Sequence, residues 1–219
     1  MNDIQNRIIF PLDDMSKFRA REWCCLLDEK VAYFKIGLEL FLSNGPKMID
    51  IMPPHRFMLD LKLHDIPTTM EKATRVAASY GVSLLTIHAS AGKEAMRKCV
   101  EAAKGAETNI VAVTILTSLV FDRLRFETMV EEAVSAGVTH FVCSPNEAKF
   151  IKFVNRDAVI ITPGISLSGE KRDDQQRVNT PIFAVKNGAS YIVVGRPIRE
   201  AKEPLNVIDS INQSLRGLR

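Results

Sequence analysis

Cysteine and histidine are scarce in this chain, which limits the redox and metal chemistry available to it. The 219 residues include four cysteines and four histidines. Two of the cysteines are adjacent, and none has the C-x-x-C spacing of a redox pair or a zinc site. The histidines also lack the paired spacing of a metal site. We therefore expect reduced thiols that serve as small apolar residues, and no zinc or redox centre.

Long apolar runs and concentrated positive charge are also missing. No stretch approaches the roughly 20 apolar residues that a membrane-spanning helix needs. Polar Asn2, Asp3, Gln5 and Asn6 stand where a secretory signal would have its apolar core. The net charge of +3 is scattered and forms no basic stripe for nucleic acid. We expect a cytoplasmic protein that binds neither membrane nor nucleic acid.

Linkers and low-complexity segments are absent, so we predict a single domain over residues 1–219. Hydrophobic residues make up 46% of the chain and charged residues 25%, which is ordinary for a globular protein. The length suits a single α/β barrel.

Short apolar or β-branched runs alternate with segments of helical apolar spacing. Eight candidate strands occupy residues 7–12, 31–36, 56–63, 82–89, 110–116, 139–143, 158–162 and 191–194. The candidate helices occupy residues 16–27, 38–52, 68–80, 93–103, 126–136, 146–153, 181–187 and 204–215. A strand followed by a helix, eight times over, predicts a (β/α)8 TIM barrel of the α/β class.

Glycines mark the ends of several predicted helices. Gly81, Gly137 and Gly188 each stand where a helix would end in a left-handed residue before the next strand. A doubly wound open sheet is the structural alternative. It is disfavoured because residues 12–16, the first strand-to-helix turn, lack the glycine fingerprint of a dinucleotide-binding fold.

Residues 60–67 carry the strongest functional signal. Side chains alternate along a strand, so Asp60 and Lys62 point to one face and the intervening leucines to the other. Charged groups buried at a strand end lose hydration, and this cost is tolerated when they pair. A lone pair of this kind is usually structural. Asp65, three residues beyond the lysine, adds a second acid, and a lysine between two carboxylates favours a catalytic site.

The barrel prediction brings further polar residues to the same rim. TIM barrels place their chemistry at the C-terminal ends of the strands and in the loops that follow. The residues expected there are Asp13, Lys35, Asp60, Lys62, Asp65, His88, Ser90, Thr117 and Ser118. We expect them to converge around a polar ligand.

A phosphate site is predicted toward the end of the chain. TIM barrels often hold a phosphate with the loops after strands seven and eight, here residues 162–166 and 195–197. Gly195 allows the backbone to approach an oxyanion, and Arg196 offers a fork of donors. The side-chain amide of Gln175 would be a further group that contacts the phosphate. The alternative is a Gly-Arg-Pro turn without a ligand.

Taken together, these segments resemble the orotidine 5'-phosphate decarboxylase family. The family signature is similar to residues 59–69, LDLKLHDIPTT. Further segments match in the family's order at residues 34–40, 88–90, 116–118, 142–144, 162–165, 174–175 and 194–198. The resemblance implies that a homodimer, without cofactor or metal, converts orotidine 5'-phosphate to uridine 5'-monophosphate, the last step of pyrimidine synthesis.

The resemblance also implies roles for individual residues. Lys62 would protonate C6 of the pyrimidine, with Asp60 against the scissile carboxylate and Lys35 bridging Asp60 and the ribose. Asp65 and Thr69 would reach across the dimer interface, so that the active sites are shared. The other implied contacts are Asp13 with a ribose hydroxyl, Thr117 and Ser118 with the pyrimidine, and Gln175, Gly195 and Arg196 with the phosphate.

The chain departs from the family pattern at one substrate-binding residue, and two alternative functions are considered. Ser166, counted with the substrate-binding residues, stands where many family members have arginine, so the chain differs at one phosphate contact. The Asp-x-Lys-x-x-Asp spacing also occurs in magnesium-dependent barrels resembling 3-keto-L-gulonate 6-phosphate decarboxylase or hexulose phosphate synthase. Ile66-Pro67, residues 116–118 and Asp174-Gln175 favour the nucleotide enzyme. A barrel that binds nucleotides without catalysis is the other alternative.

Overall fold

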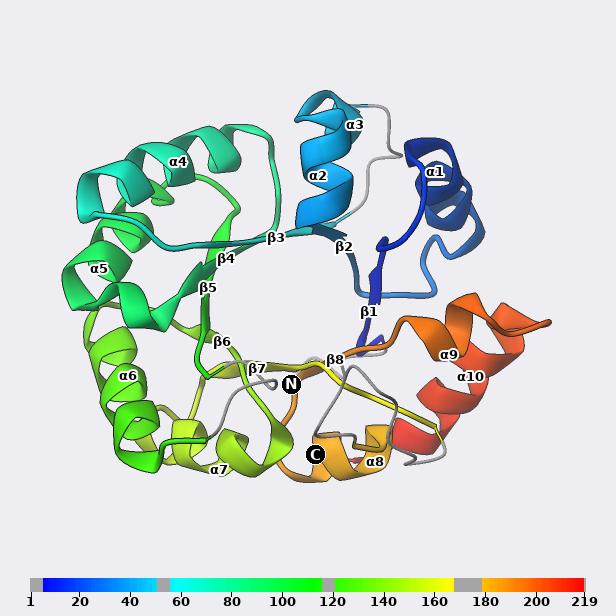
Figure 1. Ribbon diagram of the computed structural model, residues 1–219. Helices are drawn as coiled ribbons and strands as arrows, with labels where there is room; N and C mark the ends of the chain where they lie inside the picture. Colours follow the sequence, from blue (N-terminus) through cyan, green and yellow to red (C-terminus); the bar gives the residue numbers. More distant parts are fainter. Residues whose placement is uncertain (1–5, 51–55, 116–120, 168–178, 219) are drawn as a thin grey trace.

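Eight parallel strands close into a barrel in the computed structural model, which describes residues 6–50, 56–115, 121–167 and 179–218 (Figure 1). Each strand pairs with the next in the chain, and β1 pairs with β8 to close the ring. The TIM barrel prediction is confirmed. The strands are β1 Ile8–Pro11, β2 Tyr33–Gly37, β3 Phe57–Leu63, β4 Leu84–His88, β5 Asn109–Val113, β6 His140–Val142, β7 Val159–Thr162 and β8 Tyr191–Val193.

The helices lie outside the ring of strands (Figure 1). None of those in the described ranges is long and apolar enough to cross a membrane. Their bounds are α1 Lys17–Leu26, α2 Leu38–Asn44, α3 Lys47–Asp50, α4 Pro67–Ser79, the 3-10 turn η1 Ala89–Ala91, α5 Lys93–Ala102, α6 Arg123–Ser135, α7 Pro145–Val154, α8 Pro181–Lys186, α9 Arg196–Arg199 and α10 Pro204–Leu215.

Local sequence explains where most helices begin and end. Four helices start with proline: α4, α7, α8 and α10. Proline has no backbone N–H, and it costs no hydrogen bond here because N–H groups in the first turn of a helix have no acceptor within the helix. Gly81, Gly137 and Gly188 have φ of 71°, 90° and 105°. The prediction that they end helices in the left-handed region is therefore confirmed.

The expected helix over residues 38–52 is wrong, because the chain breaks it into α2 and α3. Gly45 has φ 67°, and Pro46 has no N–H to continue the helical ladder. The helix expected at 126–136 begins earlier, as α6, because the side chain of Asp122 accepts a hydrogen bond from the N–H of Arg125 at 3.0 Å. Sequence spacing did not predict η1 or α9.

Alternating side chains build two hydrophobic layers. Residues facing inward fill the barrel, and those facing outward pack beneath the helices. In the outer layer Phe10 is fully buried, with its ring 5.1 Å from Trp23 and 6.5 Å from Phe34. The four cysteines are free, and all but Cys25 are buried, which agrees with the expectation of reduced thiols. The inner layer consists of Ile9, Met58, Leu84, Val111 and Ile161, with Tyr33, Val142, Tyr191 and Val193 packed against them.

Replacing Phe10 by Ala should lower the free energy of unfolding by about 3–5 kcal/mol, because a buried aromatic ring is lost and a cavity remains. Phe153, which is 87% exposed, provides a matched control. The Phe153→Ala variant should lose about 1 kcal/mol or less. Urea unfolding of both variants measures the difference, and equal losses would contradict this description of the core.

Candidate active site

Two adjoining cavities open at the C-terminal ends of the strands. The smaller, about 180 Å³, has an apolar wall that includes Val113, Val142 and Val193, and it also contacts Lys35, Asp60 and Lys62. The second, about 340 Å³, shares Lys35 and Asp60 and continues to the loop after β8. A larger cavity of about 850 Å³, between the start of β1 and the end of α10, contains none of these charged residues.

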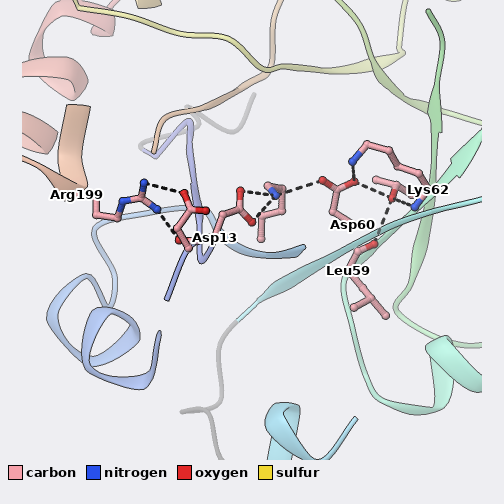
Figure 2. A network of polar contacts seen from close by, with 8 residues as sticks. Asp13, Leu59, Asp60, Lys62 and Arg199 are labelled. Atoms are coloured by element: carbon pink, nitrogen blue, oxygen red, sulfur yellow. Dashed lines mark hydrogen bonds and ion pairs between the residues drawn. The ribbon is translucent and has the colours of Figure 1, made fainter. Parts of the chain in front are cut away.

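Four charged side chains of alternating sign form a network between the two cavities (Figure 2). Lys35 Nζ lies 3.0 Å from both carboxylate oxygens of Asp13 and 3.3 Å from Asp60 Oδ2. Lys62 Nζ lies 2.9 Å from Asp60 Oδ1. Asp60 is therefore shared by two lysines. The loop after β1, β2 and β3 each contribute to this network, as the barrel prediction expected.

The end of β3 is irregular where it presents the second lysine. Between Leu59 and Leu63 the strand advances four residues, while β4 advances only two, from Leu85 to Ile87. Lys62 lies in this bulge with φ 49°, a left-handed conformation that is unusual for a residue with a side chain. The predicted alternation nevertheless holds, because the leucines of this segment pack in the outer layer while Asp60 and Lys62 meet each other.

The network keeps its members charged despite burial. Burial alone would lower the pKa of Lys35, but the carboxylates of Asp60 and Asp13 raise it above its ordinary value. Burial alone would raise the pKa of Asp60, but Lys35 and Lys62 hold it below its ordinary value. At neutral pH Asp60 is therefore an ionised carboxylate, and its contact with Lys35 is an ion pair.

Asp65 and Thr69 lie on the exposed surface after β3, apart from this network. Asp65 Oδ1 accepts a hydrogen bond from the N–H of Ile66 at 2.7 Å, and within the described ranges no ion pair joins it to Lys62. The second cation beside Asp60 is Lys35, so the described network is an acid between two lysines. A role for Asp65 and Thr69 across a subunit interface stays a prediction.

The loop after β8 is placed close to the end of β1. A Cβ atom added to Gly195 would lie 2.8 Å from Pro11 Cγ, so this close approach requires glycine. Gly195 and Arg196 line the 340 Å³ cavity together with Asp13. Ile165 also lines it, whereas Ser166 does not belong to its described lining. Thr117, Ser118 and Gln175 lie outside the described residues.

The two other rim residues lie to the side of the cavities. His88 ends β4 with its ring 5.6 Å from that of His64. Burial, followed by the charges of His64 and Lys62, lowers the pKa of His88, which leaves it neutral at neutral pH. Ser90 lines a different cavity of about 430 Å³ against α6. Neither belongs to the described lining of the two cavities at the charged network.

Sequence reasoning missed two residues that extend the network. Arg199 donates to the carbonyl of Asp13 and lies 3.1 Å from Asp14 Oδ2, which connects α9 to the loop after β1 (Figure 2). Nothing in its spacing indicated this contact. Thr86 accepts a hydrogen bond from the N–H of Lys62 at 2.9 Å. Alternation back from His88 would have placed Thr86 on the inward face of β4.

This arrangement suits an elongated anionic ligand. An arginine and backbone groups at Gly195 line one end, and an apolar wall lines the other, with the charged network between them. A phosphate binds well where Arg donors and closely approaching backbone meet. A flat ring fits an apolar slot beside a fixed ammonium, which can donate a proton to it.

Comparison with known proteins agrees with this geometry. The family model described as Orotidine 5'-phosphate decarboxylase / HUMPS family matches residues 6–211. Proteins named orotidine 5'-phosphate decarboxylase are similar over nearly the full length. The one from Gloeothece citriformis is 37% identical over 97% of this chain and 98% of its own. The one from Nitrosomonas eutropha is 38% identical over 98% of each chain.

Solved structures show the same fold. A crystal structure of orotidine 5'-phosphate decarboxylase from Lactobacillus acidophilus aligns with a TM-score of 0.82 at 27% identity, over 97% of this chain and all of that one. An uncharacterized conserved protein from Geobacillus kaustophilus aligns with a TM-score of 0.79 at 28% identity, over 94% of this chain and 98% of its own. The chain belongs to the orotidine 5'-phosphate decarboxylase / HUMPS family.

Proposed function

We propose that this chain, acting as one catalytic domain over residues 1–219, decarboxylates orotidine 5'-phosphate to uridine 5'-monophosphate. The observation that carries the proposal is the ammonium of Lys62, held against Asp60 at the mouth of an apolar cavity, in a chain whose full-length relatives bear this enzyme's name. The reaction needs no bound cofactor, because the groups that it requires are a proton donor and fixed charges.

The chemical problem is the carbanion left at C6. When the bond to the carboxylate breaks, carbon dioxide leaves and the electron pair stays on the ring carbon, where no adjacent carbonyl delocalises it. A positive charge fixed beside that carbon stabilises the transition state. Lys62 supplies this charge and then transfers a proton from Nζ to C6, which completes the product.

Asp60 controls where that proton donor lies. It holds Lys62 Nζ at 2.9 Å and remains ionised because Lys35 and Lys62 lower its pKa. The same carboxylate would face the scissile carboxylate of the substrate. The two negative charges repel more strongly in the ground state than after carbon dioxide has begun to leave, which favours bond breaking.

The ribose and phosphate would occupy the 340 Å³ cavity. Asp13 and Lys35 lie between the apolar slot and the loop after β8, where a sugar would connect the ring to its phosphate. Gly195 and Arg196 would bind the phosphate, together with Gln175. Thr117 and Ser118 would contact the pyrimidine. Because the phosphate is remote from C6, its binding energy can hold the reacting groups in place.

We propose a homodimer with shared active sites in the cytoplasm. Asp65 and Thr69 lie on the exposed surface beside the mouth of the barrel, next to Ile66, which is 67% exposed. In a dimer that covers this surface, Asp65 of one subunit would approach Lys62 of the other. Each Lys62 would then lie between two carboxylates.

Replacing Lys62 by Ala should reduce kcat by about three orders of magnitude or more, because charge stabilisation and the proton donor are lost together. The measurement is the ultraviolet change as orotidine 5'-phosphate is consumed, with circular dichroism to confirm folding. Lys104→Ala, at an exposed lysine in the turn after α5, is the matched control and should retain full activity.

The same assay separates the alternatives. Full activity in excess chelator, with none on sugar phosphates, is expected. Activity on 3-keto-L-gulonate 6-phosphate or hexulose phosphates that chelator abolishes would instead establish the magnesium-dependent chemistry. Binding of the nucleotide without turnover would establish a non-catalytic barrel.

Mixing inactive subunits tests the shared site. Lys62→Ala and Asp65→Ala chains, each inactive alone, should recover about a quarter of wild-type activity when mixed equally, because half of the random dimers contain one intact site. The recovery is measured after subunit exchange in dilute denaturant. No recovery, although mass analysis shows hybrid dimers, would assign Asp65 to its own chain.

Replacing Asp60 by Asn should lower the free energy of unfolding by about 3 kcal/mol at neutral pH, because two lysines lose their shared carboxylate. The folded pKa of Asp60 is below the ordinary 3.8, so the unfolded chain takes up the proton first as the pH falls. The difference between wild type and Asp60→Asn should therefore be fully present above that value and shrink below it. Urea unfolding between pH 7 and pH 3 measures this difference, and a constant difference would contradict the ion-pair network.

A further inference from the structure

The bulge at Lys62 leaves a backbone N–H that the sheet does not satisfy. In a regular parallel ladder this group would donate to a carbonyl of the neighbouring strand. Here the register between β3 and β4 is interrupted from Leu59 to Leu63, and the N–H of Lys62 donates to the hydroxyl of Thr86 at 2.9 Å instead. A side chain on β4 therefore replaces the ladder at the residue that carries the proton donor.

The same hydroxyl also contacts the acid of the network. Thr86 Oγ1 lies 3.0 Å from Asp60 Oδ1 and 3.5 Å from the carbonyl of Leu59. A hydroxyl has one proton to donate, and the contact of 3.0 Å is the better hydrogen bond. Thr86 thus donates to the carboxylate of Asp60 while it accepts from the backbone of Lys62 (Figure 2).

These contacts fix the orientation of the carboxylate. Asp60 Oδ1 accepts hydrogen bonds from the hydroxyl of Thr86 and the ammonium of Lys62. The other carboxylate oxygen, Oδ2, lies 3.3 Å from Lys35 Nζ. Three donors on the two oxygens leave the carboxylate little freedom to rotate. Thr86 is fully buried, so water does not readily replace its hydroxyl.

We propose that Thr86 is a positioning residue with two effects. Its hydroxyl stabilises the bulge that carries Lys62. The same hydroxyl orients the carboxylate of Asp60, which in turn holds the ammonium of Lys62. It touches no reacting atom and acts through these two residues. The proposal rests on the decarboxylase function proposed above. A proton donor displaced by even a fraction of a bond length from C6 transfers its proton more slowly, so geometry of this kind affects turnover more than binding.

Thr86→Val removes the hydroxyl and keeps the shape of the side chain, whereas Thr86→Ser keeps the hydroxyl and removes a methyl group. We expect Thr86→Val to lower kcat by about tenfold to a hundredfold with little change in KM. Thr86→Ser should stay within about threefold of wild type. The acid limb of the kcat/KM profile should move to higher pH in Thr86→Val, because Asp60 loses a donor to its ionised form.

Thr108→Val is the matched control. Thr108 is also buried, and its hydroxyl donates to the carbonyl of Val82 at 2.6 Å, just before β5 and at the other end of the barrel. This variant should lose thermal stability and keep wild-type kcat and pH profile. A purely structural role for Thr86 would make Thr86→Val behave in the same way, which would overturn the proposal.

Equal loss of kcat in Thr86→Val and Thr86→Ser would assign the effect to the methyl group and overturn the proposal. If Thr86→Val does not fold, the comparison of Thr86→Ser with Thr86→Ala carries the test, since those two side chains also differ by one hydroxyl. Wild-type protein is assayed alongside, so an absence of turnover there would refute the decarboxylase function and not the role of Thr86.

Discussion

The carboxylate of Asp60 is the group on which the site depends. It is buried, and its two oxygens are divided between Lys62 on one side and Lys35 on the other. Burial alone would favour the neutral amine of Lys35, and the carboxylates of Asp60 and Asp13 keep that lysine charged by raising its pKa. The acid in turn stays ionised because both lysines surround it. Each charge is thus retained through its neighbours, and removal of any member changes the others.

Closure of the barrel brings the segment after β8 to this network. Because β8 pairs with β1, Gly195 and the start of α9 at Arg196 lie against the end of β1 and the residues that follow it. Arg199 joins α9 to the loop after β1 through the carbonyl of Asp13 and the carboxylate of Asp14. Two segments that lie far apart in the sequence therefore meet at the cavity of about 340 Å³.

The barrel interior determines the depth of the site. A packed layer that includes Ile9, Met58 and Leu84 fills the ring, so a ligand can enter only above it, at the C-terminal ends of the strands. The small cavity, which Met58 also lines, combines an apolar wall with the charged side chains of Asp60 and Lys62. Such a cavity excludes water from a flat ring while fixed charges act on one of its atoms, which strengthens their effect.

Much of this protein is determined by its sequence. Strand and helix periodicity predicted the barrel, and two-residue alternation placed Asp60 and Lys62 on one face, because these patterns are local properties of the chain. The Gly45-Pro46 pair also indicates, from local sequence, that the helix is interrupted between α2 and α3. The spacing of apolar residues alone did not predict this interruption. Only the tertiary structure decided that Lys62 adopts φ 49°, that Thr86 satisfies its N–H, and that Arg199 reaches Asp13. The physical reason is that a bulge depends on how β3 pairs with β4, and the Arg199 contact depends on β8 lying beside β1; residue order alone specifies neither distance.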